Sequence, residues 1–183
     1  MGRVKIELRV RHAAWRSAVP ELVRLTRRAA ASAVAVAPPM PAERSAELAV
    51  LFVDDARMKA LNQRYRGQDK PTNVLAFAAQ ESAPSASPAR VPEPSTLLLG
   101  DVVLAYETTV REAKAAGKPV AAHVGHLVVH GVLHLLGYDH HRAREARAME
   151  ALEVRALEAI GLPDPYEAAL PARAMRRRGP NRR

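Results

Sequence analysis

The feature that most constrains this chain is a cluster of histidines between residues 123 and 141, where six of its seven histidines lie. The segment reads His130-Gly-Val-Leu-His134-Leu-Leu-Gly137-Tyr-Asp-His140. Residues four apart on an α-helix lie one turn apart on the same face, so the imidazoles of His130 and His134 can converge on one point. Gly137 can adopt the left-handed conformation that ends a helix, and the reversed chain can then return His140 to the same point.

Three converging imidazoles are a typical ligand set for zinc. The chain contains no cysteine, so histidines and carboxylates would have to hold any bound metal. Three neutral imidazoles leave a fourth position for water, which is the arrangement of a catalytic zinc site. We therefore expect one zinc ion per chain, bound by His130, His134 and His140 at the end of a helix in the C-terminal half. The alternative is that these are partly buried histidines on an amphipathic helix.

Hydrophobic periodicity predicts four strands and about five helices. Val4, Ile6, Leu8 and Val10 alternate with charged residues, which is the pattern of a strand with one buried face. Asp54 or Asp55 can cap a helix that ends at Gly67. The other expected strands are 47–53, 73–77 and 97–105. The expected helices are 14–31, 55–65, 106–116, 120–136 and 142–160. Pro20 falls in the first turns of the helix expected over 14–31, where a proline is tolerated. The order of these elements predicts an α+β fold with one four-stranded mixed sheet and helices packed against it.

A chain of 183 residues suits one domain, which we place at residues 1–170. Residues 79–95 contain four prolines among alanines and serines and are expected to form a flexible loop. Residues 171–183 are rich in arginine and are expected to form a disordered basic tail.

The net charge of +9 is concentrated at the two ends of the chain. Residues 1–30 carry eight basic and two acidic side chains, and residues 171–183 carry six basic and no acidic ones. Basic ends are typical of a protein that binds a polyanion, but they are also found as solvated ends that only aid solubility. With one Trp, four Tyr and two Phe, the chain has too few aromatic residues for a sheet that stacks bases. No apolar run approaches the roughly 18 residues of a membrane span, so a cytoplasmic protein is expected, with no membrane partner.

The His-x₃-His-x₂-Gly-x₂-His spacing also occurs in metzincin peptidases. Those enzymes carry a glutamate, their general base, immediately after the first histidine. This chain has Gly131 there, and no convincing Met-turn follows. A metallopeptidase is therefore the less favoured alternative.

Three blocks of the sequence, in this order, resemble the YbeY-type endoribonucleases, also called rRNA maturation factors. They are Leu61-Asn-Gln-Arg-Tyr-Arg66-Gly-Gln-Asp-Lys-Pro71-Thr-Asn-Val-Leu-Ala-Phe77, Leu99-Gly-Asp101-Val-Val-Leu-Ala105, and the segment from His126 to His140. A fourth match covers Met149 to Tyr166. Together the four matches span most of residues 47–166.

The resemblance implies a zinc-dependent, single-strand-specific endoribonuclease. It implies action in rRNA maturation, at the 3′ end of 16S rRNA, and in ribosome quality control, with single-stranded RNA, ribosomal RNA and the small ribosomal subunit as partners. The zinc ligands it implies are His130, His134 and His140, and it places Arg66 in the substrate cleft. A planar guanidinium can pair with two phosphate oxygens, which suits it to the charge that builds up during phosphodiester cleavage. Without the resemblance, Arg66 would be taken for a surface arginine at a helix end.

Other polar residues near these motifs leave alternatives open. His126 could support a metal ligand, contact phosphate or be a buried structural histidine. Asp139 could orient an imidazole or assist proton transfer, and Asp101 would cap or support its strand. His123 and His141 match no motif and are expected to be incidental. A fourth protein ligand, such as Asp139 or His126, would favour a different function, that of a non-catalytic rRNA-binding assembly factor with a structural zinc.

Overall fold

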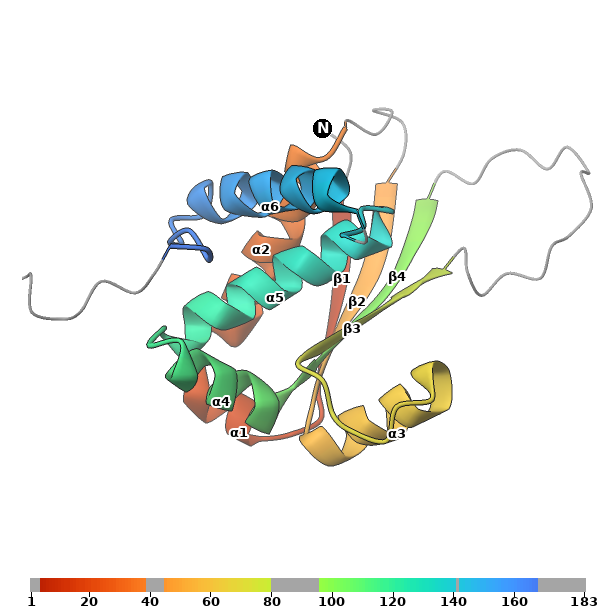
Figure 1. Ribbon diagram of the computed structural model, residues 1–183, viewed down its shortest axis with the longest axis vertical. Helices are drawn as coiled ribbons and strands as arrows, with labels where there is room; N and C mark the ends of the chain where they lie inside the picture. Colours follow the sequence, from red (N-terminus) through yellow and green to blue (C-terminus); the bar gives the residue numbers. More distant parts are fainter. Residues whose placement is uncertain (1–3, 39–44, 80–95, 141, 168–183) are drawn as a thin grey trace, which may run out of the picture.

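The computed structural model describes residues 4–38, 45–79, 96–140 and 142–167, and within them the predicted mixed sheet is confirmed (Figure 1). Its strands follow the spatial order β1-β2-β4-β3, and β3 is antiparallel to β4 while the other pairs are parallel. The α+β class follows from this mixed sheet together with the helices on its faces. The strands are β1 (Val4–Val10), β2 (Ser45–Val53), β3 (Val74–Ala78) and β4 (Thr96–Ala105).

The described residues form six helices, one more than the sequence predicted. The extra helix arises because the single helix expected over 14–31 is wrong: it breaks at Val19, whose φ of −134° and ψ of 86° are not helical. Pro20 follows, and a proline disfavours helical backbone in the residue before it and cannot donate a hydrogen bond. The helices are α1 (Ala14–Ala18), α2 (Leu22–Val36), α3 (Asp55–Arg66), α4 (Tyr106–Ala115), α5 (Val120–Leu135) and α6 (Ala143–Glu158).

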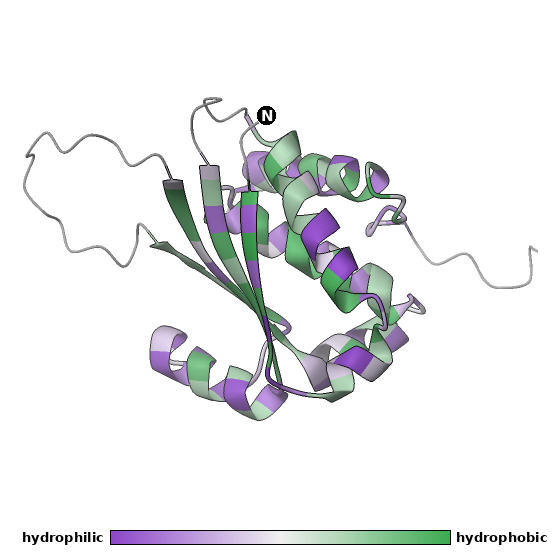
Figure 2. Cartoon of the chain, turned by 180° about the vertical axis from the view of Figure 1, so that it is seen from behind, coloured by the Kyte–Doolittle hydropathy of each residue, from purple (hydrophilic) through white to green (hydrophobic). Residues whose placement is uncertain are grey.

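The sheet is covered unequally on its two faces. Figure 1 shows α3 on one side of the sheet and the other helices on the opposite side. The larger core joins the sheet to α2, α5 and α6, whereas the smaller one lies under α3 around Met58, Leu75 and Val103. Figure 2 shows hydrophobic residues along most of β2 and β4 and mostly hydrophilic residues on α3. The helix α5 therefore lies in the larger core, packed against the sheet.

Two local features of α3 are as predicted. The side chain of Asp54 accepts a hydrogen bond from the backbone N–H of Arg57 at 2.8 Å, and Gly67 ends the helix with a φ of +68°. An N-cap carboxylate satisfies a backbone donor that the helix itself leaves unpaired, and a left-handed glycine reverses the chain at the other end. Together the two caps fix the ends of α3 and so place Arg66 as its last residue.

Some predictions fall on residues outside the described ranges. These are the loop expected at 79–95, apart from Ala79, and the basic tail expected at 171–183. Within the described part of the chain, none of the helices is both long enough and apolar enough to span a bilayer.

Candidate metal centre

The three histidines predicted as ligands meet at the C-terminal end of α5. The Nε2 atoms of His130 and His134 lie 3.1 Å apart, and one ring nitrogen from each of His130, His134 and His140 falls within 4.8 Å of the other two. Gly137 has a φ of +87°, and its N–H donates to the carbonyl of His134 at 2.9 Å. This left-handed turn reverses the chain after α5 and brings His140 back to the helix, as the spacing predicted.

The chemistry of this cluster fits a divalent metal ion such as zinc. Burial, reinforced by the nearby His130 and His140, lowers the pKa of His134 to about 4, so its imidazole is neutral near pH 7. Neutral imidazole is the form that binds a metal. Three nitrogen atoms spaced for one ion, with a neutral donor among them, are what a His₃ zinc site requires.

A buried carboxylate that the sequence analysis did not identify lies behind His130. Glu153, on α6, is 1% exposed, and its Oε1 accepts a hydrogen bond from Nδ1 of His130 at 2.7 Å. Its Oε2 accepts from Nε2 of His126 at 2.9 Å and from the hydroxyl of Tyr166. Because a carboxylate only accepts, Nδ1 of His130 carries the hydrogen and Nε2 keeps its lone pair for a metal.

The charge of Glu153 is stabilised by its hydrogen-bond partners. Burial alone would raise the pKa of this carboxyl, but the hydrogen bonds from His126, His130 and Tyr166 outweigh burial and lower the pKa to about 2. The sequence held one signal for this residue: Glu153 lies on the same stripe of α6 as the buried Met149 and Leu157. A charged residue on an apolar stripe almost always has a buried partner.

His126, His130 and Glu153 form a second group in which ligand atoms lie within 4.8 Å of one another. Their atoms are already joined by hydrogen bonds of 2.7 and 2.9 Å, so hydrogens occupy the space between them. The arrangement is that of a carboxylate orienting a candidate metal ligand, and not of a second ion site. His126 thus contacts the same carboxylate that orients His130.

Arg66 and the three histidines line the same cleft, whose volume is about 700 Å³. Arg66 is exposed at the end of α3, and the cleft continues along one edge of the sheet. The β3 side of the cleft is lined by Thr72, Asn73, Val74, Ala76 and Ala78, and the α5 side by His130, Gly131, His134 and the turn that follows. The structure thus brings Arg66 into the same cleft as His130, which lies 64 positions later in the sequence.

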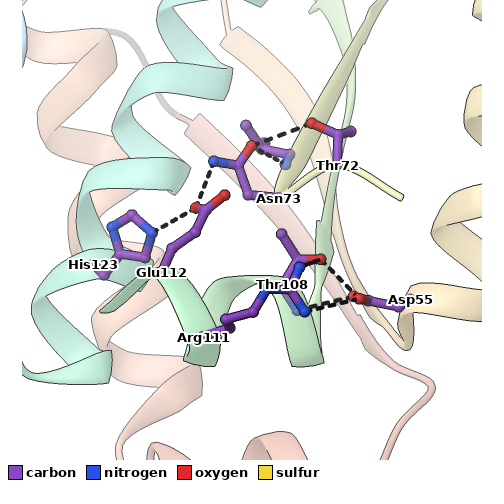
Figure 3. Close-up of polar contacts among 8 residues, drawn as sticks. Asp55, Thr72, Asn73, Thr108, Arg111, Glu112 and His123 are labelled. Carbon is purple, nitrogen blue, oxygen red and sulfur yellow. Dashed lines mark hydrogen bonds and ion pairs between the residues drawn. The ribbon is translucent and has the colours of Figure 1, made fainter. Parts of the chain in front are cut away.

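A second polar network lies beside this cleft (Figure 3). Oε2 of Glu112, on α4, accepts hydrogen bonds from Nδ2 of Asn73 at 2.8 Å and from Nε2 of His123 at 3.1 Å. His123, expected to be incidental, lies outside the three-histidine group, and its imidazole joins α5 to α4. A neighbouring part of the network joins α3 to α4, where Asp55 accepts from the N–H and the hydroxyl of Thr108.

The remaining candidates have simpler surroundings. Asp139 lines the cleft, and its Oδ1 accepts the backbone N–H of His140 at 2.7 Å, which stabilises the turn carrying that histidine. Asp101 is exposed on β4, opposite Phe77 in the register with β3. His141 lies outside the described residues.

The fold and this site define a class: an α+β protein with a His₃ candidate metal centre in an open cleft that also contains an arginine. The model of the family described as Endoribonuclease YbeY matches residues 12–161. The chain belongs to this family of endoribonucleases. Membership confirms the resemblance seen in the sequence and the expected enzyme class, an RNA-cleaving hydrolase.

Several curated relatives named Endoribonuclease YbeY are similar to this chain. One from Rhodopseudomonas palustris strain BisA53 is 54% identical over 121 residues, which is 66% of this chain and 67% of the relative. Those from Rhodospirillum rubrum and Parvibaculum lavamentivorans are 49% and 50% identical over 157 residues, covering 83% and 86% of this chain and 76% and 82% of the relatives. A solution structure of a Thermotoga maritima protein aligns with 85% of this chain and 91% of its own, with a TM-score of 0.48 and 19% identity.

Proposed function

We propose that this protein is a zinc-dependent, single-strand-specific endoribonuclease that acts on ribosomal RNA. Its place would be the cytoplasm, in maturation of the 3′ end of 16S rRNA and in ribosome quality control, with the small ribosomal subunit as partner. Family membership supports the reaction class. The observation that carries the proposal is that three histidines converge in one cleft with Arg66.

His130, His134 and His140 would hold the zinc ion. A zinc ion bound there would act as a Lewis acid toward phosphate and lower the pKa of a coordinated water. The chain's own contribution is to orient His130, whose ring Glu153 fixes through Nδ1, and to keep His134 neutral by burial. Because each imidazole must be unprotonated to bind, metal occupancy should fall in acid.

Arg66 would stabilise the charge that builds up on the phosphate during cleavage. Its guanidinium offers parallel N–H donors that can pair with two phosphate oxygens. Arg66 lines the cleft from the α3 side while the histidines line it from the α5 side. With zinc held by the histidines, a phosphodiester lying in the cleft would have positive charge on both sides.

The geometry disfavours a metallopeptidase of the metzincin type. A Cβ atom added at Gly131 would lie 2.5 Å from Cγ1 of Val102, which is fully buried in β4. This contact is far closer than carbon atoms tolerate, so the helix can take only glycine at that place without rearrangement. The position that carries the glutamate base of those peptidases is here packed against the sheet.

The second alternative, an rRNA-binding assembly factor with a structural zinc, calls for four protein ligands. Within the described residues, the group around His134 contains three histidines. The side chain of His126, one candidate for a fourth ligand, is hydrogen-bonded to Glu153. Three ligands in an open cleft favour an enzyme.

The decisive experiment combines metal analysis with RNA cleavage. We expect purified wild-type protein to hold about one zinc per chain and to cut an end-labelled single-stranded RNA while leaving the matching duplex intact. His134→Ala should lose both zinc and cleavage. His12→Ala, which changes a histidine that packs against Tyr106 outside the cleft, should retain both. Cleavage by His134→Ala at the wild-type rate would overturn the proposal.

A further inference from the structure

Glu112 joins three elements of the fold through a single carboxylate oxygen. It lies on α4, and its Oε2 accepts from Asn73, immediately before β3, and from His123, on α5 (Figure 3). Because a carboxylate only accepts, Nε2 of His123 carries the hydrogen. Glu112 itself does not line the cleft, so it can act on the cleft only through these two partners.

Asn73 is held firmly at the β3 side of the cleft. Its Oδ1 accepts the backbone N–H of Val74 at 2.7 Å, and its backbone carbonyl accepts the N–H of Ala105, the last residue of β4, at 2.9 Å. With its Nδ2 bound to Glu112, Asn73 uses both ends of its side-chain amide. Since Thr72, Asn73 and Val74 line the cleft, their position sets where this wall lies.

The wall that Asn73 anchors is short and includes Arg66 at its other end. Arg66 ends α3, and seven residues lead from Gly67 to Asn73. The middle of this segment is also bound to α3, because Nδ2 of the buried Asn62 donates to the carbonyl of Lys70 at 2.7 Å. Displacement of Asn73 would therefore act on Arg66 through a seven-residue segment that is hydrogen-bonded to α3 near its middle.

His123 connects the same carboxylate to the metal-binding helix. It lies seven residues before His130 on α5, which is about two helical turns or ~10 Å along the axis. An α-helix packed into the core over this length behaves as a rigid body. The hydrogen bonds from His123 and Asn73 to Glu112 therefore link the helix of His130 and His134 to the wall of the cleft that carries Arg66.

We propose that Glu112 is a positioning residue of this enzyme, which sets the separation between the Arg66 side of the cleft and the metal-binding side. The inference rests on the proposed function. Removing the carboxylate removes this link between the two walls, and small errors in the placement of a catalytic group are costly: about 1 Å can cost about 10²-fold in rate. We expect Glu112→Ala to lower kcat for single-stranded RNA by about tenfold or more, with metal content unchanged.

The conservative variant Glu112→Gln provides a rescue. Both donors converge on one oxygen, so the amide oxygen of glutamine can accept both hydrogen bonds while the charge is lost. Glu107→Ala is the matched control: Glu107 lies on the same helix, and its Oε2 accepts the N–H of Asp55 at 2.7 Å, joining α4 to α3 outside the cleft. We expect Glu112→Gln and Glu107→Ala to keep kcat within about threefold of wild type.

The experiment measures kcat, KM, zinc content and melting temperature for these variants, each alone and in an Arg66→Lys background. If Glu112 acts by placing Arg66, Glu112→Ala should cost several-fold less kcat in the Arg66→Lys background than in wild type. A loss of the same size in both backgrounds, or a loss equal to that of Glu107→Ala, would overturn the proposal.

A second measurement keeps the inference separate from the proposed function. Amide hydrogen exchange at Val74 and Ala105 should be faster in Glu112→Ala than in Glu107→Ala, because the start of β3 has lost its anchor. If wild-type protein cleaves no RNA, the proposed function fails and the catalytic role of Glu112 with it, while exchange still decides whether Glu112 anchors the wall. Equal exchange in the two variants would overturn the anchoring itself.

Discussion

Oε1 of Glu153 lies 2.7 Å from Nδ1 of His130, so a buried carboxylate on α6 orients a candidate metal ligand on α5. The same carboxylate accepts hydrogen bonds from His126 and from the hydroxyl of Tyr166. These contacts fix which ring nitrogen of His130 faces the cleft. They make the metal centre depend on the packing of two helices.

Glu153→Gln should weaken metal binding by about 10- to 100-fold, the usual cost of removing the partner that orients a metal-binding histidine. An amide at this position keeps the shape of the side chain but loses the charge that holds Nδ1–H of His130. Zinc affinity would be measured by competition with a chromophoric chelator. Glu150→Gln, an exposed neighbour on α6, serves as the control and should bind zinc like wild type. Equal affinity in both variants would show that Glu153 does not support the site.

Arg66→Lys should lose about 10²-fold in cleavage rate while keeping its metal. The charge is retained, but the two parallel donors of the guanidinium are lost, and removing one transition-state donor typically costs that much. Single-turnover cleavage of a labelled RNA gives the rate. Arg64→Lys, which changes an arginine near the Tyr65 ring on the same helix, is the matched control and should cleave normally. A lysine at position 66 that supports near wild-type cleavage would refute this role.

Gly131→Ala should destabilise the protein. The new methyl group would lie 2.5 Å from Cγ1 of the buried Val102, and overpacking of this kind costs ~1–3 kcal/mol. Alanine recovers ~1 kcal/mol of that through its higher helix propensity. Urea unfolding should show the net loss, and the loss should shrink in a Val102→Ala background, where space is available. If Gly131→Ala is equally costly in both backgrounds, the clash is not with Val102.

The metal-free protein should lose stability as the pH falls below 6.5, in part because of His123. Burial lowers the pKa of this imidazole from its ordinary value of 6.5, although its contact with Glu112 opposes the shift. Below pH 6.5 the unfolded chain therefore binds more protons at His123 than the folded chain, and the free energy of unfolding falls with decreasing pH. His123→Asn should flatten this dependence, measured by urea unfolding at stepped pH in EDTA. An unchanged slope, matching that of a His12→Asn control, would contradict the prediction.

Removal of residues 171–183 should weaken RNA affinity and reduce its salt dependence without abolishing cleavage. The segment carries six arginines and none of the proposed ligands. If all six charges met phosphates, the slope of log K against log salt would change by about 4, and partial engagement would give less. Replacing the six arginines with lysine should preserve the slope. A slope unaltered by the truncation would mean that the segment is only a solvated end.

Local features of the fold could be predicted from the sequence because their causes lie within a few residues. The alternation of Val4–Val10, the Asp54 cap and the left-handed Gly67 all appear as expected. The helix predicted over 14–31 is wrong, because the chain breaks at Val19 and Pro20 into α1 and α2. Its cause is also local, so a stricter treatment of the proline would have corrected it.

The sequence by itself determined that three histidines converge, because helical spacing and one glycine turn bring His130, His134 and His140 together within eleven residues. Tertiary structure alone decided what surrounds them. Glu153 and Glu112 reach their partners from α6 and α4, across 23 and 11 positions, and Asn73 comes from the opposite wall of the cleft. A hydrogen bond between side chains on different helices depends on how those helices pack, and packing is set by the whole core rather than by any local spacing.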